Sequence, residues 1–225
     1  MKYKEILITG GAGFIGTNLT EFLLNKYPNL KITIFDNFSN NYKKFEKKFE
    51  KEIKQKQLKV VKKDLNDKEK LLIESKNIDL VFHLAANSDI SLAINDPLID
   101  FNGTLITSNL LECCRINKIK KIIYTSGSGI YGDNKNLQKE ENIKKINPIS
   151  FYGASKIACE GLMSSYSHMF NIEISVFRMA NIIGNYSTHG VIFDFLKKLN
   201  LDKSNLNILG DGNQNKSYLH VDDLI

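Results

Sequence analysis

Short apolar runs alternate with longer segments of helical periodicity through most of this 225-residue chain. Each run is nearly continuous in apolar residues, as a strand buried on both faces of a sheet requires. Strands that alternate with helices predict right-handed crossovers and a parallel, doubly wound α/β sheet. The expected strands are 6–9, 31–35, 58–62, 80–84, 121–124 and 174–178, and the clearest expected helices are 14–27, 97–116 and 150–170.

The regular alternation of strand and helix stops after Gly184. We therefore expect one domain over residues 1–184 and the beginning of a second, smaller part over residues 185–225. A loop leads into this second part, and a GDG turn interrupts it. The elements expected there are a helix at 191–199 and strands at 206–209 and 218–221.

The segment GGAGFIG lies directly between the first expected strand and the first expected helix. Its GxxGxxG spacing lets the backbone turn tightly and lets a pyrophosphate approach the helix N-terminus. Free N–H groups and the helix dipole favour an anion at that end. In this strand–turn–helix context the motif predicts a Rossmann-type dinucleotide-binding domain. The residues expected to contact the cofactor here are Gly10, Gly13, Phe14, Ile15 and Gly16.

Asp36 ends the second expected strand, about twenty residues after the last of these glycines. A carboxylate at this place hydrogen-bonds the adenosine ribose hydroxyls and would repel a 2′-phosphate, so the sequence favours NAD over NADP. Ligands of open α/β sheets bind at the carboxyl ends of the strands. We interpret His83, at one such end, as structural. The other residues expected to contact the cofactor are Asn37, Asp64, Leu65, Leu84, Ala85 and Ala86.

The segment YGASK places Tyr152 and Lys156 four residues apart near the start of an expected helix, so their side chains share one face. A phenol has an ordinary pKa of about 10 and is a poor base at neutral pH. The ammonium of Lys156 and the positive nicotinamide of NAD would favour the phenolate. Tyr152 could then take a proton from a sugar hydroxyl as hydride leaves the carbon, and Lys156 could also hold the nicotinamide ribose.

Taken in order, GGAGFIG, Asp36-Asn37, HLAA, IYGD, YGASK and RMANIIG resemble the motifs of the NAD-dependent epimerase/dehydratase family of extended short-chain dehydrogenase/reductases. The resemblance covers the whole chain. Two later segments, HGVIFDF and GDGNQNKSYLHVDD, are similar to the nucleotide-sugar part of UDP-glucose 4-epimerase-like members.

This resemblance implies tightly held NAD, oxidation of a nucleotide-sugar substrate, most plausibly a UDP-sugar, to a keto intermediate, and return of the hydride. It also implies that Asn181 and Lys216 contact the diphosphate of the substrate. The family usually has Arg where Lys216 stands; Lys keeps the positive charge but loses the bidentate fork of the guanidinium.

Gly127 occupies a position where family members usually have the Ser or Thr that hydrogen-bonds the sugar oxygen. Ser126 or Ser128 must then supply the hydroxyl, or no residue does, and we favour Ser126 by a small margin. Dehydratases of the family typically carry Thr-Asp-Glu where this chain has Gly127-Ser128-Gly129, so a 4,6-dehydratase is the second hypothesis after a 4-epimerase. A non-catalytic NAD-binding or RNA-binding relative is the third, although such relatives commonly lose the Tyr-Lys pair that this chain keeps.

Two further features differ from the family pattern. Family members usually have Asn four residues before a Thr in the long helix; counted back from Thr107, that position is Gly103, with Asn102 next to it. The chain also ends at Ile225, where family members continue. We therefore expect an incomplete sugar-binding part with apolar surface exposed around 191–199.

Composition narrows the partners. The net charge is +6, but the basic residues are nearly all Lys, and in the dense stretch 43–56 they alternate with Glu. We interpret that stretch as a solvated helix face and expect no nucleic-acid partner. The sequence contains no apolar run of about 18 residues, so no membrane span is predicted. Three cysteines, two of them adjacent, suit neither a disulfide framework nor a metal site and indicate the cytoplasm. The resemblance implies a homodimer through the helices at 97–116 and 150–170.

Overall fold

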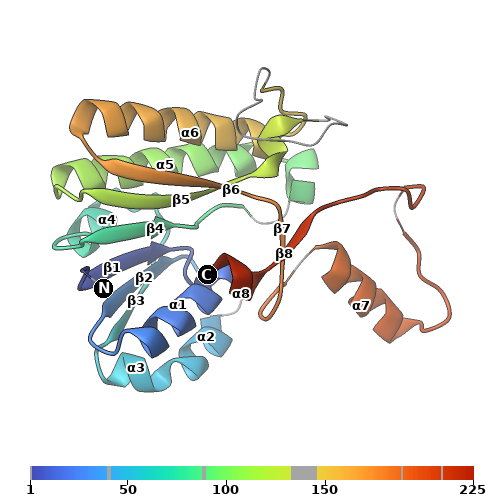
Figure 1. Ribbon diagram of the computed structural model, residues 1–225, viewed down its shortest axis with the longest axis horizontal. Helices are drawn as coiled ribbons and strands as arrows, with labels where there is room; N and C mark the ends of the chain where they lie inside the picture. The colour runs from blue at the N-terminus through green and yellow to red at the C-terminus, as the bar shows by residue number, and fades with distance from the viewer. Residues whose placement is uncertain (1, 40–41, 88–89, 133–145, 189, 209) are drawn as a thin grey trace.

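A six-stranded parallel sheet forms the centre of the computed structural model (Figure 1). Its strands are β1 (Glu5–Thr9), β2 (Lys31–Asp36), β3 (Leu58–Lys62), β4 (Leu80–His83), β5 (Lys121–Gly127) and β6 (Glu173–Met179). They lie in the order β3-β2-β1-β4-β5-β6, which is the Rossmann order, so the predicted fold class is confirmed. The structure describes residues 2–39, 42–87, 90–132, 146–188, 190–208 and 210–225.

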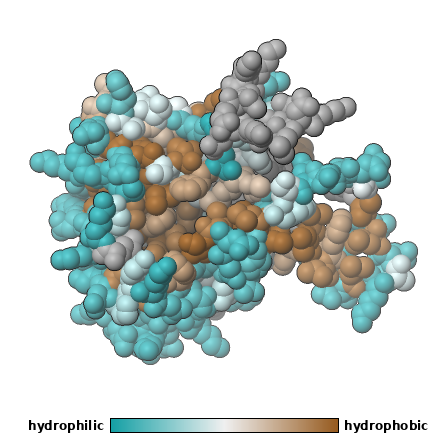
Figure 2. Space-filling view, in the orientation of Figure 1, coloured by the Kyte–Doolittle hydropathy of each residue, from teal (hydrophilic) through white to brown (hydrophobic). Residues whose placement is uncertain are grey.

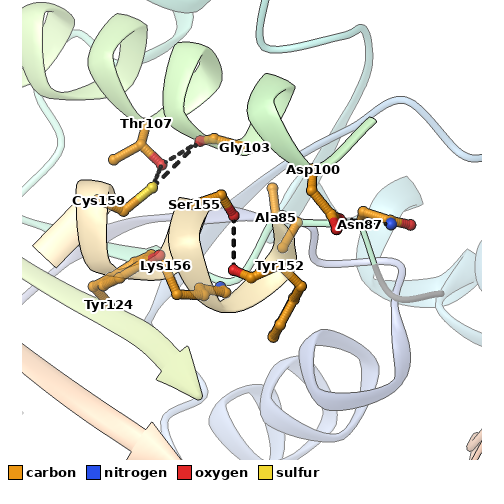
Figure 3. A pocket seen from close by; sticks show the side chains of 11 residues that line it. Ala85, Asn87, Asp100, Gly103, Thr107, Tyr124, Tyr152, Ser155, Lys156 and Cys159 are labelled. Carbon is orange, nitrogen blue, oxygen red and sulfur yellow. Dashed lines mark hydrogen bonds between the residues drawn. The ribbon is translucent and has the colours of Figure 1, made fainter. Parts of the chain in front are cut away.

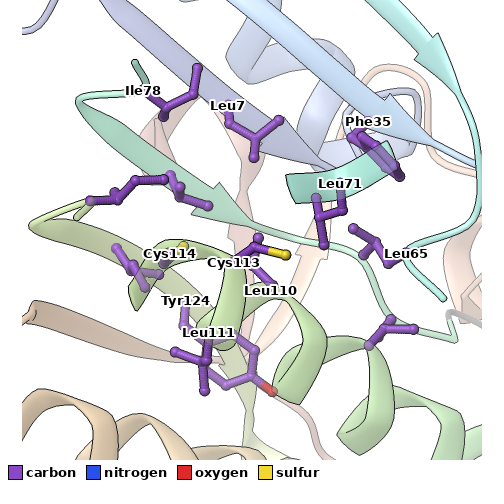
Figure 4. Packing of buried hydrophobic residues seen from close by; sticks show 14 of the residues in the cluster. Leu7, Phe35, Leu65, Leu71, Ile78, Leu110, Leu111, Cys113, Cys114 and Tyr124 are labelled. Carbon is purple, nitrogen blue, oxygen red and sulfur yellow. The ribbon is translucent and has the colours of Figure 1, made fainter. Parts of the chain in front are cut away.

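Helices cover both faces of the sheet because alternate residues of each buried strand point to opposite faces. In β1, Ile6 and Ile8 pack into one apolar cluster and Leu7 packs into the other. The first face carries α1 (Phe14–Lys26), α2 (Tyr42–Lys48) and α3 (Glu50–Lys54). The face shown in Figure 4 carries α4 (Lys68–Glu74), α5 (Leu98–Ile116) and α6 (Phe151–Phe170), and a short 3₁₀ helix, η1 (Ile90–Ile94), precedes α5.

The charged stretch 43–56 is more than a solvated face. It forms two helices, α2 and α3, which are separated at Phe49. Phe45 and Phe49 are buried against the sheet, and their ring centres lie 4.8 Å apart. Lys44 and Lys47 remain exposed. The prediction of a solvated face therefore holds for Lys44 and Lys47, while the two phenylalanines pack the segment against the core.

The end of the chain forms a small second sheet. Strands β7 (Asn181–Ile183) and β8 (Tyr218–His220) pair in parallel, and α8 (Val221–Leu224) follows and contacts α1. The predicted strand at 206–209 is wrong over residues 206–208, which form no strand because no described strand pairs with them. Leu209 lies outside the described residues.

Helix α7 (Val191–Leu201) stands away from the rest of the molecule (Figure 1). None of its described residues is buried, and its apolar side chains form a brown surface on this arm in Figure 2. The apolar surface expected around this helix is thus exposed. The side chains concerned are Val191, Ile192, Phe193, Leu196 and Leu201.

Two further observations concern the described residues alone. Among them, no helix has both the length and the apolar character needed to cross a membrane. No group of His, Cys, Asp and Glu side chains in this part of the chain is arranged to hold a metal ion. The thiols of Cys113, Cys114 and Cys159 are buried and unpaired.

Candidate active site

The glycine-rich turn after β1 lies against the end of β4, where the strand order reverses direction. Gly10 has a φ of +68°, and a Cβ atom there would lie 2.7 Å from the Cα atom of Ala85. Gly16 is as tightly placed, because its Cβ atom would lie 2.5 Å from the carbonyl oxygen of Gly10. These contacts hold the N-terminus of α1 at the sheet edge where a dinucleotide pyrophosphate binds in such folds.

The N-terminus of α1 is open to an anion. Gly13 is its N-cap residue, and no side chain caps the helix. Phe14 and Ile15 follow and are half-buried. Backbone N–H groups that no side chain caps, together with the helix dipole, favour a phosphate at this position. The geometry of the turn is therefore compatible with the pyrophosphate contact that the motif predicts.

Asp36 lies at the end of β2 and is held by two backbone hydrogen bonds. Its Oδ2 atom accepts the N–H of Ala12 at 3.0 Å, and its Oδ1 atom accepts the N–H of Phe38 at 2.7 Å. Burial raises the pKa of Asp36 above its ordinary value, while both N–H bonds act to lower it. Each carboxylate oxygen has a second lone pair, so the side chain can still accept ribose hydroxyls.

The remaining residues expected at the cofactor site end neighbouring strands. The exposed Asn37 donates from Nδ2 to Oδ2 of Asp64 at 3.1 Å, which links the ends of β2 and β3. Leu65 is buried in the core cluster. Leu84 and Ala85 are half-buried and Ala86 is exposed at the end of β4. The structure thus brings these residues to one edge of the sheet, except that the side chain of Leu65 points into the core.

Tyr152 and Lys156 occupy the first turns of α6, whose N-terminus is capped by Ser150 Oγ, which accepts the N–H of Gly153 at 3.0 Å. The buried Lys156 donates from Nζ to the carbonyl oxygen of Thr125 in β5 at 2.7 Å. The same Nζ atom lies 5.5 Å from the centre of the Tyr152 ring. The predicted pair is therefore held together at the carboxyl end of β5.

Burial dominates the acid–base properties of this pair. It lowers the pKa of Lys156 to about 8. Burial, and after it the charge of Asp100, raises the pKa of Tyr152 to about 12. The protein groups alone therefore keep the phenol protonated at neutral pH. A Tyr152 phenolate needs positive charge beyond that of Lys156, as expected if the nicotinamide contributes.

Strand β5 continues to Gly127, further than predicted, and this separates the two candidate serines. Ser126 pairs with Arg178 of β6 and is buried on that side of the strand. Successive residues of a strand point to opposite faces. A Cβ atom on Gly127 would accordingly lie 3.5 Å from the phenol oxygen of Tyr152. Ser128 begins the exposed 3₁₀ helix η2 (Ser128–Tyr131).

The Ser126 hydroxyl lies close to a half-buried ion pair. Arg178 donates from Nη2 to Oε2 of Glu160 at 2.7 Å. Burial acts to raise the pKa of Glu160, but Arg178 and, less strongly, the nearby Ser126 hydroxyl lower it overall. The Ser126 hydroxyl itself makes no well-aligned hydrogen bond in the described part of the chain. The structure therefore places Ser126 with Arg178 and Glu160, and only position 127 faces Tyr152 directly from the strand.

Two polar residues that the motifs did not indicate, Asn87 and Asp100, line a small cavity behind Tyr152 (Figure 3). Asp100 of α5 accepts on Oδ1 a hydrogen bond from Nδ2 of Asn87 at 2.9 Å. Asn102 points elsewhere and accepts a hydrogen bond from Asn66. A count of four residues back from Thr104, rather than from Thr107, would have reached Asp100.

The contacts of His83 support its interpretation as a structural residue. Its Nδ1 atom lies 2.7 Å from the hydroxyl of Thr9, and its Nε2 atom lies 2.9 Å from the hydroxyl of Thr107. Thr107 donates its own hydrogen to the carbonyl oxygen of Gly103. It must therefore accept from Nε2–H, which assigns the neutral Nε2-protonated tautomer. Burial lowers the pKa of His83 to about 3.

We expect His83→Leu to lower the free energy of unfolding by roughly 2 kcal/mol at pH 8, because the Thr9 hydroxyl loses its buried partner. This deficit should shrink as pH falls below about 6.5, vanish at about pH 5 and then reverse, so that the variant becomes the more stable protein. In the unfolded state of the unmutated protein, His83 gains a proton near its ordinary pKa of 6.5. In the folded state the pKa of His83 is about 3, so the proton binds only at much lower pH. Native stability therefore falls by about 1.4 kcal/mol per pH unit across that window, and the variant lacks this loss.

Urea unfolding at a series of pH values measures the effect. His168→Leu, at an exposed histidine of α6, is the matched control and should leave the pH dependence unchanged. A deficit that stays constant between pH 6.5 and pH 3 would show that His83 titrates alike in both states.

The two residues expected at the substrate diphosphate lie close together: Asn181 is in the second sheet, and Lys216 comes two residues before β8. Asn181 begins β7, and its Nδ2 atom donates to the carbonyl oxygen of Ser217 at 3.1 Å. Lys216 is the preceding residue, and its side chain is exposed. The structure therefore brings the two positions together. Both follow β6, the last strand of the main sheet, in the sequence.

Known proteins share this architecture and these motifs. A model of the "NAD dependent epimerase/dehydratase family" matches residues 6–225. The chain is 33% identical to a putative UDP-glucose 4-epimerase of Methanocaldococcus jannaschii, covering 97% of this chain and 70% of the relative. It is also 33% identical to a dTDP-D-glucose 4,6-dehydratase of Dictyostelium discoideum, covering 99% of this chain and 54% of the relative.

A solved structure adds the cofactor. The UDP-glucuronic acid 4-epimerase of Bacillus cereus, in complex with UDP-glucuronic acid and NAD, superposes with a TM-score of 0.85 at 29% identity. That match covers 98% of this chain and 70% of the other. The chain thus spans 54% to 70% of the length of these three proteins. With the family model matching nearly every residue, the chain belongs to the NAD-dependent epimerase/dehydratase family, and its cofactor is NAD.

Proposed function

We propose that this protein is a nucleotide-sugar 4-epimerase, acting on a UDP-sugar through a keto intermediate. This proposal rests on one arrangement: Tyr152 and Lys156 lie together, and position 127, a glycine without a side chain, faces Tyr152. The glycine-rich turn after β1, where NAD is expected to bind, lies at the same sheet edge. Tyr152 stands where a proton acceptor for a sugar hydroxyl is needed, and Lys156 is fixed next to it by β5. Such a pair serves reversible oxidation of an alcohol without further acids.

In this reaction Tyr152 takes the proton of the sugar hydroxyl and later returns it to the same oxygen. Bound NAD supplies the hydride acceptor and a positive charge close to the phenol. Lys156 lies 5.5 Å from the Tyr152 ring, so its ammonium stabilises the phenolate through space. Because proton and hydride both return to the sugar, the protein ends in its starting state and no net redox change occurs.

The absence of an acidic residue at positions 127–129, beside Tyr152, favours the epimerase over the dehydratase. A Cβ atom on Gly129 would lie 3.7 Å from Cδ1 of the Tyr152 ring, so that position faces the site. Elimination of water needs an acid and a base at the sugar. This chain supplies Ser128 and Gly129 where dehydratases of the family typically have Asp and Glu, and the dehydratase stays the second hypothesis.

Incubation with NAD and UDP-glucose tests the proposal. We expect UDP-galactose, an isomer of unchanged mass, to accumulate until both sugars are at equilibrium. A product lighter by one water would identify a dehydratase instead. If a panel of UDP-sugars is unchanged while NAD binds, the protein is a non-catalytic member of the family.

Asp36→Ala is expected to weaken NAD binding by roughly 10- to 100-fold, since a charged acceptor of ribose hydroxyls contributes about 1.5–3 kcal/mol. The preference for NAD over NADP should narrow as well, because the charge that repels a 2′-phosphate is gone. Calorimetric titration with both dinucleotides measures this. Asp36→Asn, which keeps an acceptor for the N–H of Ala12, separates loss of charge from loss of the turn. Equal affinities of the unmutated protein for NAD and NADP would contradict the proposed preference for NAD.

The division of the chain is part of the same proposal. Residues 1–184 bind NAD, and residues 185–225 begin the nucleotide-sugar-binding part. Asn181 of β7, which donates to the carbonyl oxygen of Ser217, and the neighbouring Lys216 hold the substrate diphosphate. Lys216→Ala should then raise the KM for a UDP-sugar and leave the affinity for NAD unchanged.

A homodimer and a cytoplasmic location complete the proposal. Leu98, Phe101 and Leu105 are exposed along one face of α5, and the exposed Phe151 of α6 contacts the Phe101 ring. Apolar residues spaced in this way on two packed helices suit pairing with a second copy. A mass of one chain in light scattering would contradict the dimer. The buried free thiols suit the reducing cytoplasm.

A further inference from the structure

Asp100 is the most unusual polar residue in the interior of this protein. It is only 2% exposed, and it belongs to α5, on the side that packs against α6. Its Oδ1 atom accepts the amide of Asn87, but its Oδ2 atom has no hydrogen-bond partner among the described residues. A buried carboxylate oxygen without a partner is costly, because the charge has lost its hydration without compensation.

Asp100, whose Oδ2 atom has no hydrogen-bond partner within the described ranges, lines the cavity behind Tyr152. Ser155 and Lys156 line the same cavity, as Figure 3 shows. The cavity has a volume of about 10 Å³ for the centre of a water molecule, which is close to the minimum for one buried water. The Asp100 carboxylate, the Ser155 hydroxyl and the Lys156 ammonium offer that water the polar partners it requires.

We propose that Asp100 is a further functional residue of this site, which binds one water in the cavity with its free oxygen and governs when Tyr152 releases its proton. The inference rests on the proposed role of Tyr152 as proton acceptor. Asp100 acts through Tyr152, so it is a positioning residue. A negative Asp100 opposes a negative Tyr152.

The other ionisable groups around the cavity do not replace this effect. Lys156 favours the phenolate, whereas Tyr124 of β5 is neutral, since burial raises its pKa. Burial also keeps His83 neutral, with a pKa of about 3. Glu160 is paired with Arg178, and Cys159 donates its thiol to Thr107 and Gly103. Among these described groups, Asp100 is the unpaired negative charge next to Tyr152.

Titration of Tyr152 in Asp100→Asn tests this inference without a sugar substrate. The amide of Asn fills the same volume and still accepts from Asn87, but it carries no charge. The NAD-loaded protein is titrated by the ultraviolet absorption of tyrosinate, and the signal of Tyr152→Phe is subtracted to remove the other tyrosines. We expect the midpoint of Tyr152 to fall by roughly one pH unit. The low-pH limb of kcat/KM should move in parallel.

Asp194→Asn, on the exposed helix α7, removes the same charge away from the cavity and is the matched control. An unchanged midpoint in Asp100→Asn, or an equal shift in the control, would overturn the inference. If Asp100→Asn does not fold, Asp100→Ser removes the charge with a smaller side chain and gives the same two outcomes. Because the titration needs no substrate, a protein inactive on UDP-sugars can still confirm or refute the role of Asp100.

Discussion

Tyr152→Phe is expected to lower turnover of a UDP-sugar by about 10²–10⁴-fold, the range that a positioned proton acceptor contributes. The change removes one oxygen from a half-buried side chain, and that oxygen makes no described contact that the fold needs. NAD affinity should therefore stay close to the native value. Steady-state turnover and calorimetric titration with NAD, made on the same preparation, measure the two effects separately.

Tyr166→Phe is the matched control for this prediction. Tyr166 lies further along the same helix, and its hydroxyl donates to Glu112. Its loss should leave turnover within a few-fold of native. If Tyr152→Phe kept most of its turnover, another group would have to accept the proton, and the epimerase mechanism described above would be refuted. Loss of NAD together with loss of turnover would instead indicate a structural role for Tyr152.

Gly127→Ser is expected to increase turnover by about tenfold or more. One well-placed hydrogen-bond donor to the developing oxyanion supplies roughly 10²–10³ in rate, and this chain lacks a side chain at the position closest to Tyr152. The backbone at Gly127 is extended, with φ −148° and ψ 160°, so serine fits without strain. Its Cβ atom would lie in ordinary contact, 3.5 Å from the phenol oxygen.

Gly127→Ala adds the same Cβ atom without the hydroxyl, and it should bring no gain. Equal effects of Ser and Ala would show that the hydroxyl is irrelevant. Ser128→Ala distinguishes a further case: if the exposed Ser128 already reaches the sugar oxygen, its removal slows the native protein but not Gly127→Ser. Ser126→Ala should have little effect on turnover, since Ser126 lies on the Arg178 side of β5.

Local sequence patterns were sufficient for the features that depend on backbone geometry. The glycine turn, Asp36 and the Tyr152–Lys156 pair each follow from short-range spacing, and the structure places them at one sheet edge. The choice between Ser126 and Ser128 depended on where β5 ends. A strand that continues by a few residues alternates its side chains across the sheet, so the boundary decides which residue meets Tyr152.

Asp100 could not be identified from the motifs in the same way. It lies within an amphipathic helix, and nothing in its immediate sequence distinguishes a buried carboxylate from a solvated one. Its partners are Asn87, in a loop, and Tyr152, on another helix, so their meeting depends on how α5 and α6 pack. The same holds for Phe45 and Phe49, whose burial within a lysine-rich stretch is a tertiary effect.

The close approach of Gly10 to Ala85 has a consequence for folding. The two residues lie far apart in the sequence, and their contact exists only after β4 has docked beside β1. Asp79 fixes this pairing by accepting the N–H groups of Lys4 and Glu5. Such a long-range contact closes a large loop and forms late during folding. We expect a dinucleotide bound across this contact to bind the native chain alone, which makes local opening less favourable and should protect both strands from proteolysis.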